Sequence, residues 1–338
     1  MSSNHLCSPR TWSAAIGLLS VLGLVACDGE ISSNAETRRP DVGVEARTVS
    51  LGPAVGRRLT REEYVNSLEV VLGAVVDPDD YDLPRDERIP EGFRNSSQDM
   101  LLSPARVRAY DAIASDAVAQ ADVPARVSVH ASCTDMRDEC YESFVDSMGL
   151  VLLRRPLTDT DRAVFSSLFT VAQEEGEGFD AGAALVMRAM LQSPRFLYRL
   201  ESQAGATAGE GREVDAFELA TRLSFLVWNA APDEELLGLA SDGRLADQVS
   251  AQVERMLAHP RARRALRQYV EQWLYLDALP ESFALGADMK EETYRLFERL
   301  VWEEDADLMR AFTEKQAELS GELAEFYGLS PLESGFAT

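Results

Sequence analysis

Signals for the start of a helix recur along this chain, and they constrain its fold more than any other feature does. Thr60 and Glu63 have the spacing of a capping box, in which each side chain binds an exposed backbone amide. Asp215 and Glu218 repeat that spacing, and Ser103 precedes a proline at the first helical position. No segment shows sustained alternation of apolar and polar residues, the pattern of a half-buried strand. The sequence therefore predicts an all-α fold.

Apolar residues follow these signals at helical spacing and indicate where the helices run. The expected helices begin near Thr60, Pro104, Thr158, Asp215, Pro232 and Pro260, and a further one carries Tyr294, Phe297, Leu300 and Val301. The helix that begins near Asp215 is expected to reach Trp228, and the one that begins at Pro260 is expected to reach about Leu276. Both Trp228 and Trp273 are expected in the core, because tryptophan is large and usually much buried.

The N-terminus resembles a bacterial lipoprotein signal. Arg10 precedes an apolar run from Trp12, and the small residues before Cys27 are typical of a cleavage site. Residues 1–26 are therefore expected to be the signal peptide and Cys27 the site of lipid attachment, with the protein in the cell envelope, on the periplasmic or surface face of a membrane. The alternative is an uncleaved anchor, but the run is shorter than the roughly 20 apolar residues that a spanning helix needs.

Composition separates a tether from the folded part. Residues 27–53 are rich in Ser, Asn, Glu, Arg and Pro, a composition that does not repay the entropy of ordering, so a flexible tether is expected there. The remaining chain is apolar enough for a large core, since 46% of all residues are hydrophobic. Its length exceeds what one compact core usually holds, so we expect two or three modules after the disordered tether, arranged as a multi-helix array.

Net charge limits the partners. The 338 residues include 33 Lys and Arg against 57 Asp and Glu, which gives a formal net charge of −24. Binding of nucleic acid depends on basic residues that neutralise phosphates, so no nucleic-acid partner is expected. The same charge would repel an anionic membrane surface, which leaves the lipid on Cys27 as the expected contact with the bilayer.

Three motif-bearing stretches lie in order along the chain. The first is RRLTREEY at residues 57–64, the second joins RRPLT at 154–158 to SPRFLYRLE at 193–201, and the third joins ELATRLSFLVW at 218–228 to QWL at 272–274. They resemble domains of unknown function (DUF) 1587, 1595 and 1592 of one multi-module bacterial group of planctomycete and myxobacterial type. The resemblance implies helical modules at residues 54–122, 131–202 and 213–278.

Residues 279–338 are expected to contain the incomplete start of a further, DUF1588-like module, because EFYG at residues 325–328 is similar to its beginning. Members of the group usually continue through two more modules, and some carry a cytochrome c domain. The Cys-x-x-Cys-His motif that attaches haem is absent from this sequence, so no cofactor is predicted.

Cys133 and Cys140 remain once the cysteines of the signal peptide and the lipid site are set aside. An oxidising compartment favours disulfides, and relatives have a similar pair just before the RRPLT motif. We therefore expect a structural disulfide, with free thiols and metal ligation as alternatives. A zinc site would need further Cys or His, and only His130 and His259 remain in the processed chain, so no metal site is predicted.

Arg154 and Arg155 could form an anion site, because two guanidinium groups there meet the N-terminus of the next helix. A structural explanation also accounts for these residues. The arginines complement the end of one helix, Pro156 stops it, and Thr158 caps the next with Asp161 at the box position.

The acidic stretch from Asp77 to Asn95 invites comparison with a calcium loop, which needs spaced oxygen ligands and a glycine at its sharp turn. Asp82 stands where that glycine would be, so a solvated acidic loop is the preferred interpretation.

No nucleophile elbow, phosphate loop or dinucleotide fingerprint is present in the sequence. The leading hypothesis is an extracytoplasmic lipoprotein whose helical modules form a scaffold or interaction unit with protein partners in the cell envelope, in the service of a redox or degradation system. The alternative is an enzyme, a hydrolase or an oxidoreductase component, whose site is built from unremarkable residues or lies in further C-terminal modules.

Overall fold

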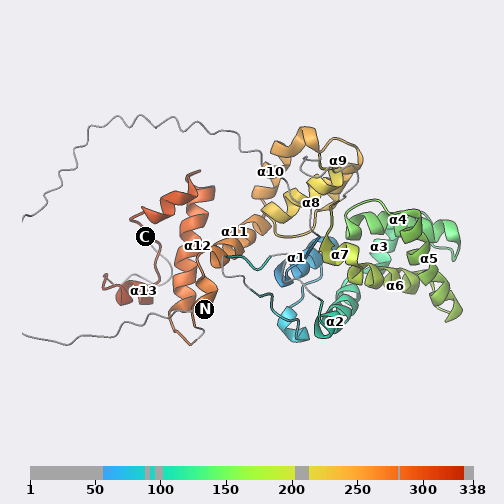
Figure 1. The fold of residues 1–338 in the computed structure, drawn as a ribbon, viewed down its shortest axis with the longest axis horizontal. Helices are drawn as coiled ribbons and strands as arrows, with labels where there is room; N and C mark the ends of the chain where they lie inside the picture. The colour runs from blue at the N-terminus through green and yellow to red at the C-terminus, as the bar shows by residue number, and fades with distance from the viewer. Residues whose placement is uncertain (1–55, 88–91, 96–101, 202–212, 281, 331–338) are drawn as a thin grey trace, which may run out of the picture. The chain divides into compact units, whose positions relative to one another are not determined.

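The computed structural model describes residues 56–87, 92–95, 102–201, 213–280 and 282–330. Within them the predicted fold class is confirmed, because they form thirteen α-helices and a single two-stranded sheet (Figure 1). The described residues all fall within one compact unit. The predicted signal peptide, Cys27 and the tether at 27–53 lie outside the described residues. Among the helices that the structure describes, none is long and apolar enough to cross a membrane.

The elements are given in chain order, grouped by the expected modules. Those of the first are β1 (Arg57–Arg58), α1 (Arg61–Leu72), the 3-10 helix η1 (Pro78–Tyr81) and α2 (Pro104–Gln120), and α3 (Val123–His130) lies between the first and the second. Those of the second are α4 (Asp138–Leu153), α5 (Asp159–Glu174), α6 (Phe179–Gln192), α7 (Pro194–Leu197) and β2 (Tyr198–Arg199). Then come α8 (Ala216–Val227), α9 (Glu234–Ser241), η3 (Ala246–Gln248), α10 (Val249–Leu257), α11 (Pro260–Trp273), η4 (Leu276–Ala278), α12 (Gly286–Trp302), η5 (Leu308–Phe312) and α13 (Gly321–Phe326).

The predicted capping boxes are present. The Thr60 hydroxyl accepts a hydrogen bond from the Glu63 amide at 3.1 Å, and the Glu63 carboxylate accepts one from the Thr60 amide at 2.8 Å. Asp215 begins α8 in the same reciprocal way, as Thr158 begins α5. These bonds satisfy amides that have no partner inside the helix, so each helix starts where its capping residue stands.

Two predicted boundaries need correction. Pro232 does not begin α9, because Asp233 is the N-cap and accepts a hydrogen bond from the Leu236 amide at 3.0 Å. The helix that begins at Pro260 ends at Trp273 and does not reach Leu276. Tyr275 there has a φ of 58°, a left-handed conformation that cannot continue a right-handed helix.

The first two modules share one hydrophobic core. Tyr64 of α1, Phe144 of α4 and Phe169 of α5 are fully buried in the same cluster, and α5 packs on α6 beside α4 (Figure 1). A second cluster is built around Trp228, which is 2% exposed and donates a hydrogen bond from Nε1 to the Met256 carbonyl at 2.9 Å. The predicted boundary between residues 122 and 131 is therefore a boundary in sequence and does not separate two cores.

Candidate functional site at the junction of the modules

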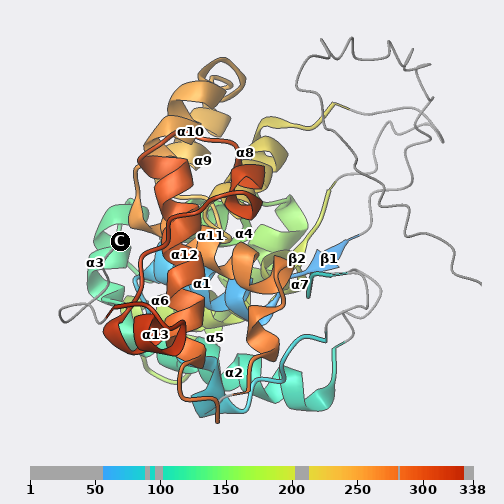
Figure 2. The ribbon, with the colours of Figure 1, turned by 90° about the vertical axis from the view of Figure 1, so that its left-hand side faces the viewer.

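A short strand pair joins the first module to the second. β1 and β2 are antiparallel, with Arg57 opposite Arg199, and the Leu59 amide donates to the Leu197 carbonyl at 2.7 Å (Figure 2). Like charges directly opposite each other in a ladder repel. Glu63 offsets this repulsion, since its Oε1 lies 3.7 Å from Nη2 of Arg57 and 3.4 Å from Nη1 of Arg199.

Glu63 is a buried carboxyl at this junction, with only 3% of its side chain exposed. Burial raises the pKa of Glu63 above its usual value, and the Arg57 charge and the Thr60 amide oppose that increase. Arg57, Arg199 and Glu63 all line the same cavity, so the carboxyl belongs to a site as well as to a cap.

Arg154 stands at the end of α4 and binds backbone carbonyls of the second module. It is the C-cap of α4 and is 4% exposed, and its guanidinium donates to the carbonyls of Arg195, Phe196 and Tyr198 at 2.7, 3.1 and 3.0 Å. Burial lowers the pKa of Arg154 to about 10. This arginine fastens the end of α4 to α7 and β2.

Arg155 is more open than its neighbour. One of its Nη atoms lies 3.1 Å from the carboxylate of Asp215, the N-cap of α8, so this pair connects the second module to the third. The capping prediction for Thr158 and Asp161 is confirmed next to it. Arg154 and Arg155 both line one small cavity, and the predicted anion site remains a prediction there.

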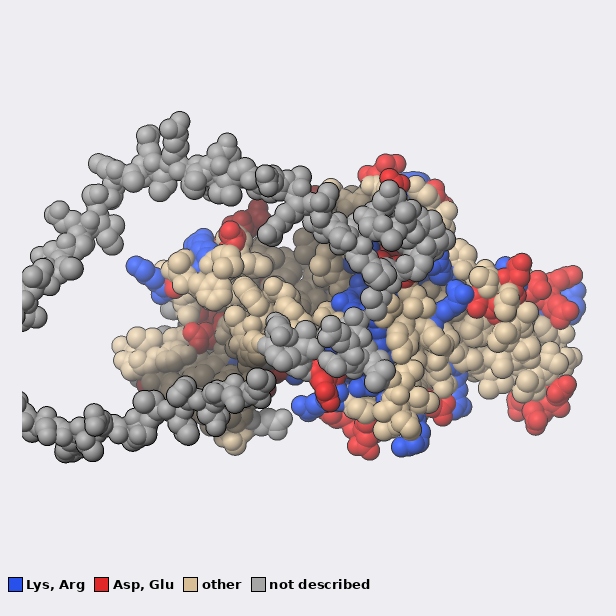
Figure 3. Space-filling view, viewed as in Figure 1, with Lys and Arg blue, Asp and Glu red and all other residues tan. Residues whose placement is uncertain are grey.

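That cavity has a volume of about 70 Å³ and is bordered by five arginines. They are Arg154, Arg155, Arg195, Arg199 and Arg222. Two carboxylates, Glu201 and Glu218, also line it. Three further carboxylates pair with its arginines, since Asp161 pairs with Arg195, Asp215 with Arg155 and Glu63 with Arg199. We call it the arginine cavity. Figure 3 shows Lys and Arg side chains gathered around α7, whereas Asp and Glu crowd the outer ends of α4 and α5.

A larger cavity of about 520 Å³ adjoins it, and all three modules contribute to its wall. We call it the junction cavity; its lining comprises Arg57, Thr60, Glu63, Phe93, Asn95, Arg199, Glu201, Arg222, Phe225, Leu226, Asn229, Ala265, Gln268, Tyr269 and Gln272. Its volume lies in the range of sites that hold small molecules. Arg199, Glu201 and Arg222 line both cavities, so the two are adjacent.

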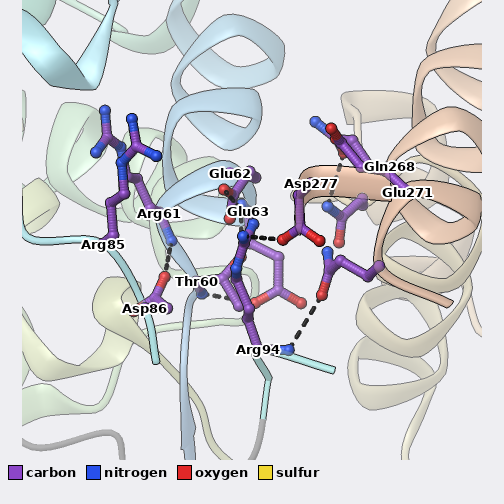
Figure 4. Close-up of polar contacts among 12 residues, drawn as sticks. Thr60, Arg61, Glu62, Glu63, Arg85, Asp86, Arg94, Gln268, Glu271 and Asp277 are labelled. Carbon is purple, nitrogen blue, oxygen red and sulfur yellow. Dashed lines mark hydrogen bonds and ion pairs between the residues drawn. The ribbon is translucent and has the colours of Figure 1, made fainter. Parts of the chain in front are cut away.

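The acidic stretch after α1 holds the first module against the third (Figure 4). The Arg94 amide donates to the Gln272 side chain at 3.0 Å, and the Arg94 guanidinium pairs with Asp277. Arg61 pairs with Asp79 at 2.5 Å. These contacts place Phe93 and Asn95 at the wall of the junction cavity.

The prediction of a solvated loop is wrong for Asp86, whose side chain is 2% exposed. It lies 2.6 Å from Nη2 of Arg58 and 3.4 Å from Nη2 of Arg106, and it accepts a hydrogen bond from the Arg61 amide. A buried carboxylate needs such partners because burial removes its hydration. The described residues include no group of three or more His, Cys, Asp or Glu that could hold a metal ion.

Cys133 and Cys140 form a disulfide that joins the loop after α3 to the first turn of α4 and lines neither cavity. Sequence reasoning missed Glu63, Arg199, Arg222 and Asn229 as site residues. The first three appeared only within capping or family motifs, and no local signal brings residues 63, 199 and 222 together. One clue was available, since arginine recurs in the motifs of the first and second modules.

Comparison with family models agrees with the predicted order of modules. Residues 57–123 match the model of a family of proteins of unknown function, DUF1587. Residues 140–201 match the model of the family DUF1595, and residues 214–329 match that of DUF1592. The DUF1592 match extends well past residue 278, so the segment in which a DUF1588-like module was expected lies largely within it. No curated protein and no solved structure matches the chain.

Proposed function

Since the chain belongs to the group of proteins that carry DUF1587, DUF1595 and DUF1592 modules in this order, we propose a function for the junction at which the three modules meet. The protein is a lipid-anchored binding unit of the cell envelope, and the junction holds a small anionic ligand. The observation that carries this proposal is the convergence of five guanidinium groups on the arginine cavity in a chain with a net charge of −24.

Arg155 and Arg222 retain donors for a ligand. Arg222 uses Nε and Nη2 for Glu201, both at 2.7 Å, and Arg155 uses one nitrogen for Asp215. Each guanidinium carries five N–H donors in a planar fork that suits carboxylate, sulfate and phosphate oxygens. Partly buried donors of this kind bind an anion more strongly than exposed ones, because water competes less.

The anion proposal is tested by ligand-induced stabilisation of the purified full-length protein. Acetate and sulfate should raise the unfolding midpoint above that in sodium chloride of equal ionic strength, since a ligand at ten times its Kd stabilises by about 1.4 kcal/mol. Arg222→Gln should abolish the effect. Arg244→Gln is the matched control, because Arg244 is an exposed arginine that pairs with Asp242 close by in sequence. Equal midpoints in all three salts would reject the anion site.

The lipid anchor is supported by the sequence that leads to Cys27. Cells fed a clickable fatty acid should label the native protein and should not label Cys27→Ala. The native protein should have lost residues 1–26. Membrane association of an unlabelled, fully processed native chain would contradict the proposal.

A second candidate, the scaffold or interaction unit, is favoured by an exposed apolar groove of about 600 Å³ on the first two modules, lined by residues that include Val118, Val171 and Leu185. Affinity capture of the lipidated protein from membranes should then recover a stoichiometric protein partner. Leu185→Asp should lose that partner, and Val164→Asp, an exposed change on α5 outside the groove, should keep it. Recovery of the bare chain alone would contradict the scaffold role.

A further inference from the structure

The two cavities differ in the chemistry of their walls. The arginine cavity, at about 70 Å³, has room for roughly two water molecules at ~30 Å³ each, which is also the space of one carboxylate or sulfate group. The junction cavity holds several times that volume. A ligand that fills both therefore has a compact anionic group attached to a larger body.

Amide side chains line the junction cavity and are held in place by their acceptor oxygens. Gln268 Oε1 accepts hydrogen bonds from Asn229 Nδ2 at 2.9 Å and from Asn66 Nδ2 at 3.3 Å. Gln272 Oε1 accepts from the Arg94 amide at 3.0 Å. With these oxygens engaged, the amide nitrogens of both glutamines are the groups that remain to donate to a ligand. Such donors suit hydroxyl oxygens.

The backbone at Asn229 supports this arrangement. Asn229 directly follows the end of α8 and Trp228, and its φ is 52°, in the left-handed region that non-glycine residues seldom adopt. Its carbonyl accepts a hydrogen bond from Asn66, and its side chain donates to Gln268. Residues held in such conformations cluster at ligand sites, where surrounding contacts fix them.

Aromatic rings complete the wall. Phe93 and Tyr269 stack with ring centroids 5.4 Å apart and planes at 20°, and Tyr269 is 43% exposed. Such rings offer an apolar surface beside polar groups. A sugar ring is amphipathic in the same way, with C–H groups on its faces and hydroxyl groups around its edge. The carboxylates of Glu63 and Glu201 add acceptors for those hydroxyl groups.

We propose that the two adjacent cavities together bind a sugar ring that carries a compact anionic group, a carboxylate or a sulfate. The anionic group occupies the arginine cavity, and the ring lies in the junction cavity against the amides and the Phe93–Tyr269 pair. This inference rests on the proposed anion site and goes beyond it by naming the body of the ligand. The arginines alone would accept any small anion.

Isothermal titration of the purified full-length protein tests the inference with five probes: glucuronate, glucose 6-sulfate, glucose, acetate and sulfate. Glucuronate or glucose 6-sulfate should bind at least ten-fold more tightly than its anion alone, acetate or sulfate, and more tightly than glucose. The better of the two identifies the anionic group.

Tyr269→Ala should remove the ten-fold advantage and leave the affinity for acetate or sulfate unchanged, whereas Arg222→Gln should weaken both. Tyr327→Ala is the matched control, because Tyr327 is 45% exposed and lies outside both cavities. Its affinities should equal those of the native protein. Circular dichroism of each variant shows whether its fold is retained.

The outcomes separate the inference from the proposed function. If acetate or sulfate binds as tightly as the anionic sugars, the sugar inference fails and the anion site stands. If glucose binds as tightly as they do, the inference fails as well, because the anionic group then contributes nothing. If none of the five probes binds, both the inference and the anion site are rejected.

Discussion

Oε1 of Glu63, on α1, lies 3.4 Å from Nη1 of Arg199, on β2, so a carboxylate of the DUF1587 module neutralises an arginine of the DUF1595 module. The same carboxylate caps α1 through the Thr60 amide. A single buried side chain thereby fixes the start of a helix, joins two modules and borders the junction cavity.

The ionisation of Glu63 should make stability depend on pH. The pKa of Glu63 is raised in the folded protein by burial, so the folded state holds this proton more tightly than the unfolded state does. Stability from this group is therefore full below the unfolded pKa, about 4.3, and is lost as pH rises through the folded pKa. We expect the unfolding free energy of native protein relative to Glu63→Gln to fall as pH rises above about 4.3.

Chemical denaturation of the native protein and of Glu63→Gln at several pH values measures the difference between their unfolding free energies. The titration of the other carboxylates cancels in that difference. A difference that is constant with pH, or that rises, would contradict the raised pKa.

Arg154 and Arg155 are neighbours, but their substitution by alanine should lower the unfolding free energy by different amounts. Arg154→Ala leaves three carbonyls without their buried donor and should lower the unfolding free energy by about 3 kcal/mol. Arg155→Ala removes a half-exposed ion pair with Asp215 and should cost less than about 1 kcal/mol. Urea unfolding of the two variants measures both. Equal costs would show that Arg154 does not fasten α4 to α7.

The Cys133–Cys140 disulfide should stabilise the second module. It closes a short loop, with a sequence separation of 7 residues. The chain-entropy model gives about 2.5 kcal/mol for a loop of this size. The double variant Cys133→Ser, Cys140→Ser should lose about that much unfolding free energy and keep the binding affinities of the native protein. Free thiols detected by alkylation in the native secreted protein would reject the bond.

Two glycines in helices should respond in opposite directions to alanine. At Gly182, on α6, a Cβ would collide with the buried ring of Phe169, so Gly182→Ala should destabilise by about 1–3 kcal/mol. At Gly238, on α9, a Cβ meets no atom within 4 Å, so Gly238→Ala should stabilise by about 0.5–1 kcal/mol. Thermal unfolding of both variants checks the pair. Destabilisation by Gly238→Ala would mean that α9 packs differently.

Local chemistry explains what could be predicted from the sequence. The starts of α1, α5 and α8 depend on hydrogen bonds between residues three apart, such as Thr60 and Glu63. Both partners can therefore be identified from the sequence alone. The start of α9 was misplaced because Asp233 competes with Pro232 as the first signal and caps the helix through its side chain.

The site depends on distant partners, which sequence patterns do not pair. β1 meets β2 across more than 140 residues, and two residues a strand are too few for an alternating pattern. The burial of Asp86 was missed for the same reason, because its partner Arg58 lies on the other side of α1 in the sequence. Arg154 and Arg155 were both named as a possible anion site from their place before a helix start, and both line the arginine cavity, where Arg154 is buried and Arg155 is more open.

The central claim is that the arginine cavity, where the modules meet, binds an anion. A crystal of the full-length protein soaked in selenate, a sulfate analogue with a strong anomalous signal, tests it most directly. The account predicts an anomalous peak between Arg155, Arg199 and Arg222, which is absent from crystals of Arg222→Gln. An empty cavity in the native crystal, with selenate found only at other arginines, would contradict it.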